Sequence, residues 1–188
     1  MPVDRQKAEQ AIAAFLKALG HDPAATPELS RTPALVAEAF ERELLAGYAI
    51  DVPALLAAES GELSAEEGRG LVVVRNIHVA TVCPHHLLPG LGTATVAYFP
   101  GERLVGIGAL SRTVEAFSRR LALQESIGDR VVRALVEHAG ARGAYCRLEL
   151  AHACLSARGA RQAAATVVTV ARAGLEIPDS AVGGGGPP

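Results

Sequence analysis

Residues 71–100 read LVVVRNIHVATVCPHHLLPGLGTATVAYFP, and this stretch decides the fold. Two runs rich in Val, Thr and other β-branched or aromatic residues stand on either side of a short segment that contains Pro-Gly. Runs of this composition separated by turn residues predict two antiparallel strands joined as a hairpin. A third run, RLVGIG at residues 103–108, follows another Pro-Gly turn and extends the predicted sheet.

The segments after this sheet alternate between helical and strand patterns. Apolar residues return every three or four positions in two successive stretches, 111–121 and 127–139, which predicts two helices. Strand-like runs then reappear at 144–154 and 163–173. The order of strands, two helices and strands predicts an α+β domain whose helices both cover one face of an antiparallel sheet.

The sequence before residue 70 favours helices. Apolar residues at helical spacing follow Asp4, a suitable N-cap, and end at Gly20. A second helix is predicted from Thr32-Pro33, where a capping residue precedes a first-turn proline, to about Gly47. Between there and the first strand we expect only a short helix near residues 53–58.

These patterns divide the chain of 188 residues into three regions. Residues 1–69 are predicted to form an N-terminal helical region, and residues 70–174 the core of sheet and helices. Residues 175–188 end in GGGGPP, which predicts a disordered Gly/Pro tail. A chain of this length is suited to one sizeable hydrophobic core.

The overall composition excludes several classes of protein. The formal net charge is -2, with acids and bases interspersed, so there is no basic stripe for nucleic acid. The N-terminus lacks the apolar run of a signal peptide, and no stretch approaches the roughly 20 apolar residues that span a bilayer. Three cysteines argue for reduced thiols rather than a disulfide framework. We therefore expect a cytoplasmic protein with no nucleic-acid or membrane partner.

Two short motifs supply the side chains with metal chemistry. Cys83 and His86 are three residues apart where a predicted strand ends, and His85 stands between them. A thiolate and an imidazole at this spacing can bind one zinc ion. The alternative is a buried cysteine beside two polar loop histidines.

The second motif consists of His152 and Cys154 in the predicted strand 144–154. Because residues two apart in a strand share a face, both are predicted to enter one pocket. Catalytic zinc sites use three protein ligands and leave the fourth position to water. The two motifs together supply five donors. Three of them as ligands, with two histidines left as acid and base, therefore fit a catalytic zinc site better than a structural one.

The remaining cysteine and histidines are predicted to have no part in this site. Cys146 precedes Cys154 by eight residues on the same strand, which is too far to share an ion, and is predicted to be core. His21, His78 and His138 stand outside any cluster and are predicted to be surface or structural residues.

With these motifs in this order, the chain resembles the GTP cyclohydrolase I family of the tunnelling-fold (T-fold) superfamily. The resemblance covers about residues 32–173 and is carried by TPALVAEAFERELLAGY, VVVRNIHVATVCPHHLLP, GTATVAYFP, RTVEAFSRRLALQE and LAHACLSARG. It implies a hydrolase that opens the imidazole ring of GTP, or of a related guanine derivative, with release of formate and eventual formation of 7,8-dihydroneopterin triphosphate. It also implies a Zn2+ cofactor and a homo-oligomer, a decamer of two pentameric rings with sites at subunit boundaries.

The resemblance also assigns roles to the metal-binding motifs residue by residue. It implies that Cys83, His86 and Cys154 are the zinc ligands. It implies that His85 and His152 are the catalytic histidines.

Four further residues are implied to contact the substrate. Gln124 and Glu125 correspond to the pair that recognises guanine, and a Glu125 carboxylate can accept hydrogen bonds from the N1–H and N2 amino edge. Without the resemblance, both would be ordinary residues of the first turn of a helix. Arg112 and Arg158 match basic positions near the phosphates.

The sequence departs from the family pattern at the phosphate end of the substrate. Leu35 replaces an arginine that reaches the triphosphate, and Gly108-Ala109 replaces a Ser-Lys pair. Because charge-assisted contacts to phosphate contribute about 1.5 to 3 kcal/mol each, their loss weakens binding of a triphosphate.

Three alternatives therefore stay open. In the first, the substrate is a guanine derivative without the triphosphate. In the second, the reaction stops after ring opening. In the third, the chain is a non-catalytic pterin- or purine-binding protein. A T-fold reductase of a 7-deazaguanine nitrile would need a differently placed nucleophilic cysteine, and the sequence shows none.

Overall fold

The computed structural model of the chain describes residues 3–63 and 70–183. Its contacts divide the chain into two compact units, Met1–Ala46 and Gly47–Pro188. No helix in these described ranges is long and apolar enough to cross a membrane.

The first unit consists of two helices joined by a short 3-10 turn. Helix α1 spans Arg5–Ala18, and helix α2 spans Thr32–Ala39 and continues as a π-helical turn, Phe40–Leu44. The predicted cap is confirmed, because the Asp4 side chain accepts a hydrogen bond from the backbone N of Lys7 at 3.1 Å. The Nε of Arg5 donates to Glu41 at 2.6 Å and ties α1 to the π-helical turn.

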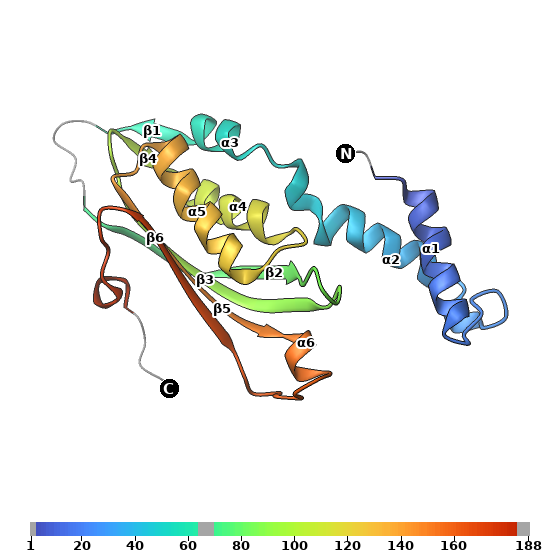
Figure 1. The fold of residues 1–188 in the computed structure, drawn as a ribbon. Helices are drawn as coiled ribbons and strands as arrows, with labels where there is room; N and C mark the ends of the chain where they lie inside the picture. Colours follow the sequence, from blue (N-terminus) through green and yellow to red (C-terminus); the bar gives the residue numbers. More distant parts are fainter. Residues whose placement is uncertain (1–2, 64–69, 184–188) are drawn as a thin grey trace. The chain divides into compact units, whose positions relative to one another are not determined.

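The second unit contains the sheet and the helices that cover it (Figure 1). Its elements in chain order are α3 Val52–Ala58, β1 Ser60–Glu62, β2 Val72–Val82, β3 Pro89–Phe99, β4 Arg103–Val105, α4 Ile107–Ser118, α5 Gln124–Ala139, β5 Gly143–His152, α6 Ala153–Ser156 and β6 Val167–Gly174. Four long strands form an antiparallel sheet in the order β2-β3-β5-β6, and β1 pairs with β4 in a small second sheet.

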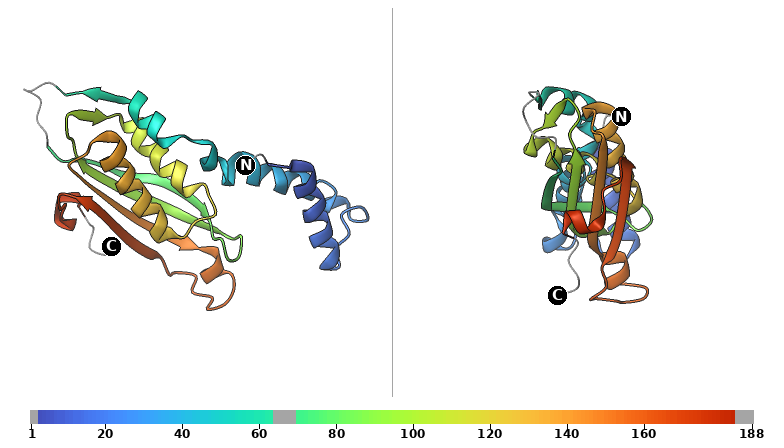
Figure 2. Two further views of the ribbon diagram at one scale, coloured as in Figure 1. Left: turned by 45° about the horizontal axis from the view of Figure 1, so that its top comes forward. Right: turned by 90° about the vertical axis from the view of Figure 1, so that its left-hand side faces the viewer.

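Helices α4 and α5 lie on one face of the four-stranded sheet (Figures 1 and 2). The hydrophobic core lies between these helices and the sheet. It contains fully buried apolar side chains from both layers, among them Val79, Leu110, Leu135 and Leu148. Burying a side chain of this size contributes about 1.5 to 3 kcal/mol. The order β2, β3, α4, α5, β5, β6 confirms the predicted α+β fold and the layering that the resemblance to the T-fold implied.

Helix α4 begins earlier in the chain than the sequence predicted. Residues 103–108 were expected to be a strand, but β4 ends at Val105 and the helix begins at Ile107. Gly106 is the N-cap, and its carbonyl accepts hydrogen bonds from Ala109 at 2.9 Å and Leu110 at 3.1 Å. The prediction failed because a short β-branched run cannot distinguish the end of a strand from the first turn of a buried helix.

A β-bulge in β2 keeps its apolar side chains on the helix side of the sheet. The register with β3 shifts between Val74 and Ile77, and Asn76 adopts a left-handed conformation with φ of 57°. Asn tolerates this region better than most residues. Because of the extra residue, Ile77 and Val79 pack into the same core as Val74 although their parity differs.

The chain after β6 covers part of the opposite face of the sheet. Ile177 and Val182 are buried against Ala97 and Tyr145, and the Tyr145 hydroxyl donates to Asp179 at 2.9 Å. The structure therefore differs from the prediction of a disordered tail over its first part, residues 175–183, because two apolar side chains in this segment find a partner surface. Residues 184–188, which contain the Gly-rich end of that tail, lie outside the described residues.

Candidate metal centre and active site

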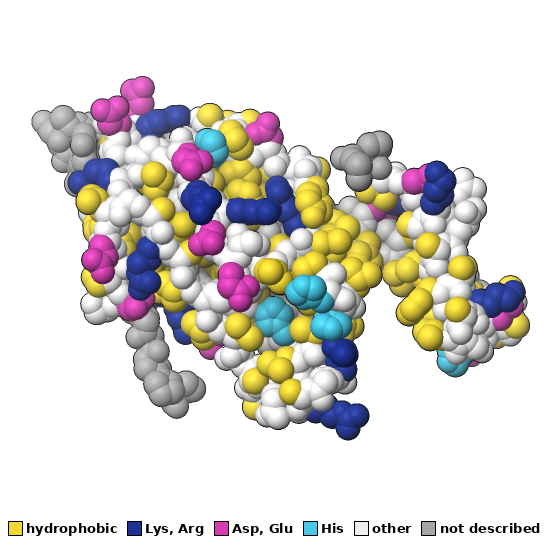
Figure 3. Space-filling view, in the orientation of Figure 1, with side chains coloured by type: hydrophobic (Ala, Val, Ile, Leu, Met, Phe, Trp, Pro, Cys, Tyr) yellow, Lys and Arg dark blue, Asp and Glu magenta, His cyan; other side chains and the backbone are white. Residues whose placement is uncertain are grey.

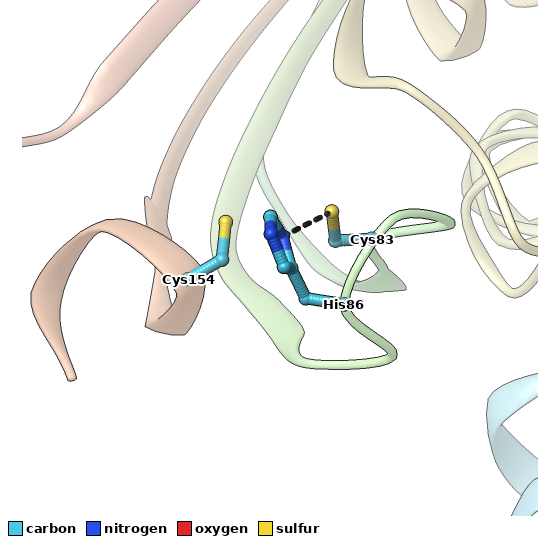
Figure 4. Close-up of side chains that lie close together, drawn as sticks. All are labelled: Cys83, His86 and Cys154. Atoms are coloured by element: carbon cyan, nitrogen blue, oxygen red, sulfur yellow. Dashed lines mark hydrogen bonds between the residues drawn. The ribbon is translucent and has the colours of Figure 1, made fainter. Parts of the chain in front are cut away.

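The hairpin loop between β2 and β3 brings Cys83 and His86 together. The loop is closed by two backbone hydrogen bonds, from Cys83 N to the Leu88 carbonyl and from Leu87 N to the Cys83 carbonyl, both at 2.9 Å. Leu87 lies in the left-handed region at φ of 54°, which turns the chain sharply after His86. The Cys83 sulfur consequently lies 3.7 Å from Nδ1 of His86 (Figure 4).

Cys154 reaches the same place from a helical turn rather than from a strand. Strand β5 ends at His152, which pairs with Gly90 near the start of β3, so the backbone beyond it has no partner strand. The chain folds into the short helix α6, in which Ala157 N donates to the Ala153 carbonyl at 2.9 Å. The prediction that Cys154 lies in the strand and shares a face with His152 by strand periodicity is therefore wrong.

Cys83, His86 and Cys154 form a group that could hold a metal ion. One ligand atom from each residue lies within 4.8 Å of the others. In a tetrahedral zinc site with bonds of 2.0 to 2.3 Å, ligand atoms are about 3.5 to 3.8 Å apart, so small side-chain movements would complete this geometry. Two thiols and an imidazole are donors that suit zinc, and the group fits that ion.

The two thiols influence each other in this arrangement. Partial burial and the neighbouring Cys83 thiol raise the pKa of Cys154 above its ordinary value. Metal ligation requires the thiolate, so binding of an ion would displace a proton from this group. Cys146, by contrast, is fully buried in the core, as predicted, and burial raises its pKa to about 12.

His85 lies at the rim of this group. Its Nδ1 is 4.0 Å from the Cys83 sulfur, and its ring meets that of His86 edge to face with centroids 6.2 Å apart. The side chain is exposed. Figure 3 shows histidine side chains gathered at the surface beside Lys and Arg side chains, at the end of the sheet where the hairpin and α6 lie.

His152 is held from the opposite side by the start of helix α5. Its Nε2 lies 2.7 Å from Oε1 of Gln124, a residue that is only 4% exposed. The amide nitrogen of Gln124 donates to the Leu148 carbonyl at 3.2 Å, the Val167 carbonyl at 2.8 Å and the Thr169 hydroxyl at 3.2 Å. No local sequence signal pointed to this contact between Gln124 and His152.

The other predicted substrate residues lie in different surroundings. Glu125 is exposed in the first turn of α5, and Arg158 is exposed after α6. Arg112 forms an ion pair with Glu59, the residue before β1. The structure does not bring Arg112 into contact with the metal-binding group of its own chain.

Comparison with known proteins shows which family the chain belongs to. The family model described as GTP cyclohydrolase I matches residues 8–182. The chain belongs to the GTP cyclohydrolase I family.

Curated members of the family align with nearly the whole chain. GTP cyclohydrolase 1 of Leifsonia xyli subsp. xyli is 42% identical over 173 residues, which cover 91% of this chain and 87% of that protein. GTP cyclohydrolase 1 of Pelagibacter ubique is 38% identical over 167 residues, covering 89% and 81%. Among solved structures, the archaeosine synthase QueF-Like in its apo form is 16% identical with a TM-score of 0.47, and the similarity covers 60% of this chain and 100% of that chain.

Proposed function

We propose that this member of the GTP cyclohydrolase I family is a zinc-dependent hydrolase that opens the imidazole ring of GTP or a related guanine derivative and releases formate. The observation that carries the proposal is the convergence of Cys83, His86 and Cys154, with ligand atoms within 4.8 Å of one another, beside His85. Family membership over residues 8–182 supports the same reaction class.

The residues of the chain divide the chemistry between them. A zinc ion bound by the two cysteines and His86 would supply a Lewis acid and activate water near neutral pH. His85, exposed at the rim, and His152, fixed by Gln124, would move protons to and from the purine ring nitrogens. The exposed carboxylate of Glu125 would accept hydrogen bonds from the guanine edge.

A second candidate substrate is favoured by the surroundings of Arg112. This arginine, proposed to contact phosphate, is already paired with Glu59. Ala109, at the position where the family carries lysine, is fully buried in the apolar core and provides no charge. The chain therefore offers less positive charge to a triphosphate than the family pattern does, which supports a guanine derivative with fewer phosphates as an alternative.

We further propose that the working form is a homo-oligomer, a decamer of two pentameric rings. Strands β2 and β6 are the two edges of the sheet within one chain, and open edges can pair with another subunit. Arg112 does not contact the metal-binding group of its own chain, so a shared pocket would need a second subunit. The mass of the protein in solution measures this directly.

A substrate series tests the proposed reaction. The zinc-loaded protein is incubated with GTP, GDP, GMP and guanosine, and formate and pterin fluorescence are measured separately. Formate together with fluorescence from GTP is the expected result. Formate without fluorescence would indicate a reaction that stops after ring opening, and ligand binding without formate would indicate a binding protein.

The metal site has its own test. Cys154→Ser is expected to lower bound zinc from one ion per chain to a small fraction, because it removes one of only three protein ligands. Cys146→Ala is the matched control and is expected to retain zinc, since Cys146 is buried in the core. Zinc content is measured by elemental analysis, and full retention of zinc by Cys154→Ser would contradict this assignment.

A further inference from the structure

The side chain of Gln124 uses all its hydrogen-bonding atoms inside the chain. Its amide nitrogen has two hydrogens and faces three oxygen acceptors, on Leu148, Val167 and Thr169. Since carbonyl oxygens only accept hydrogen bonds, the nitrogen must face them, and the orientation of the amide is fixed. The oxygen of the amide therefore faces His152.

This orientation determines which nitrogen of His152 carries the proton in the neutral ring. The Gln124 oxygen lies 2.7 Å from Nε2 and can only accept, so Nε2 must donate. The lone pair of the neutral imidazole is then on Nδ1. A neighbouring acceptor that fixes a histidine tautomer is a recurrent device for preparing a ring for proton transfer.

Gly90 makes room for the ring in this position. A Cβ atom built on Gly90 would lie 2.9 Å from Nδ1 and 3.0 Å from Cε1 of His152, closer than real Cβ contacts come. The imidazole thus lies over the backbone of β3, between a glycine below and the Gln124 amide at its Nε2. Gly90 leaves room for the ring in this orientation, and the hydrogen bond with Gln124 holds it there.

We propose that Gln124 is a positioning residue that acts through His152, and not a residue that contacts the purine. The inference rests on the proposed function for the role of His152. Gln124 is only 4% exposed, and the two N–H groups of its amide already face acceptors on β5 and β6, so neither is free for a substrate. The recognition of guanine is then left to Glu125, which is exposed on the same turn.

Kinetic measurements on the zinc-loaded full-length protein, together with binding measurements on the same protein freed of zinc so that GTP is not turned over, separate the two roles. Gln124→Met keeps the length of the side chain but removes its donor and acceptor. We expect kcat for formate release to fall by about 10- to 100-fold, in the range of a lost acid–base contribution. The Kd for GTP, measured by calorimetry on the zinc-free protein, is expected to stay unchanged, whereas Glu125→Gln is expected to raise it.

A double-mutant cycle shows whether Gln124 acts through His152. If it does, Gln124→Met has little further effect on kcat in a His152→Ala background, because coupled residues are not additive. Thr169→Val is the matched control, since it removes one acceptor of the Gln124 amide and leaves the contact with His152 in place. Thr169→Val is expected to keep kcat close to that of the unchanged protein.

A spectroscopic measurement tests the inference independently of turnover. The protein is labelled with 15N-histidine, and solid-state NMR resolves which nitrogen of each neutral imidazole carries the proton. We expect the His152 signals to report a proton on Nε2, and to show both tautomers in Gln124→Met. Signals are assigned by their loss in His152→Ala.

The possible outcomes are distinct. An increase in Kd with unchanged kcat in Gln124→Met, additive effects in the cycle, or a proton on Nδ1 of His152 would each overturn the inference. If the zinc-loaded protein releases no formate from any nucleotide while the His152 tautomer still depends on Gln124, the proposed function fails and the positioning of His152 stands.

Discussion

Leu87 is a backbone exception at the centre of the candidate site. It lies in the left-handed region at φ of 54° in the loop that carries Cys83 and His86. An L-residue with a Cβ adopts this region at a cost of roughly 1 to 2 kcal/mol. Sparsely populated backbone conformations cluster at functional sites, and here the turn at Leu87 completes the hairpin that presents the metal-binding side chains.

Replacing Leu87 by Asn should relieve this strain. Leu87 is 54% exposed, so little apolar burial is lost, and Asn tolerates the left-handed region. We expect the free energy of unfolding to rise by up to about 1 kcal/mol, measured by urea denaturation. Leu91→Asn is the control, because Leu91 is 51% exposed in β3 without a positive φ. Equal loss of stability in both variants would show that Leu87 is not strained.

At the residue scale, the kinds of side chain in the candidate site were predictable from the sequence. Their positions relative to one another were less predictable. The spacing of Cys83 and His86 indicated a metal site because a loop of this length can fold back on itself, and the structure brings both together. Cys154 arrives there for a different reason than predicted, since β5 loses its partner strand after His152. The contact between Gln124 and His152 spans 28 residues and has no local signature.

At the scale of elements, the backbone at Gly47 lies very close to the backbone at the end of α4. Gly47 N donates to the Arg119 carbonyl at 3.0 Å, and the guanidinium of Arg120 donates to the Gly47 carbonyl at 2.9 Å. The same guanidinium lies over the rings of Tyr48 and Phe117, at 5.1 and 5.2 Å from their centroids. These contacts hold the segment before α3 against the helix that leads to α5.

Gly47→Ala should disrupt this contact. A Cβ at Gly47 would lie 2.6 Å from the Ala116 carbonyl and 2.8 Å from the Arg119 carbonyl, and backbone atoms cannot move aside cheaply. We expect a loss of about 1 to 3 kcal/mol in the free energy of unfolding, the usual range for overpacking. Gly61→Ala in β1 is the matched control, because nothing lies within 4 Å of its added Cβ. The idea is wrong if the two variants have the same denaturation midpoint.

Helices and strands whose apolar residues repeat at a regular spacing were predictable. Their first and last residues were less predictable. The N-cap Asp4 and the left-handed Gly20 just after α1 act as the sequence indicated, because capping depends on neighbouring residues alone. The start of α4 at Ile107 and the bulge at Asn76 were not predicted. Both depend on which side chains must face the core, which is a property of the packed sheet.

At the scale of the second unit, the segment after β6 is held against the sheet by a partly buried polar contact. The Tyr145 hydroxyl donates to Asp179, and Arg172 donates to the same carboxylate at 2.7 Å. Burial, followed by the hydrogen bond to Asp179, raises the pKa of Tyr145 to about 12. The neutral phenol is thus the form that the folded state favours.

The raised pKa of Tyr145 determines how the stability of the folded protein changes with pH. Because the pKa is raised from 10 to about 12, the contribution of Tyr145 to stability is fully present below pH 10 and is lost as pH rises toward 12. Tyr145→Phe should therefore lose less stability than the unchanged protein over this window, although it is less stable near neutral pH. Thermal unfolding at several pH values measures this.

The control for this prediction is Tyr48→Phe. Tyr48 is 58% exposed and takes no part in the contact between Tyr145 and Asp179. The variant should follow the pH dependence of the unchanged protein. Parallel curves for Tyr145→Phe and the unchanged protein between pH 10 and 12 would contradict the role assigned to Tyr145.

The sequence by itself determined the order of strands and helices, the family, and the kinds of donor available for a metal. Periodicity, caps and short motifs are set by residues close together in the chain, so they can be read without a structure. Only the tertiary structure decided that α6 carries Cys154 to the hairpin, that Gln124 faces His152, and that Glu59 pairs with Arg112. Glu59 and Arg112 are 53 residues apart, and Gln124 and His152 are 28 apart, so their contacts arise only when the core between sheet and helices fixes where each side chain lies.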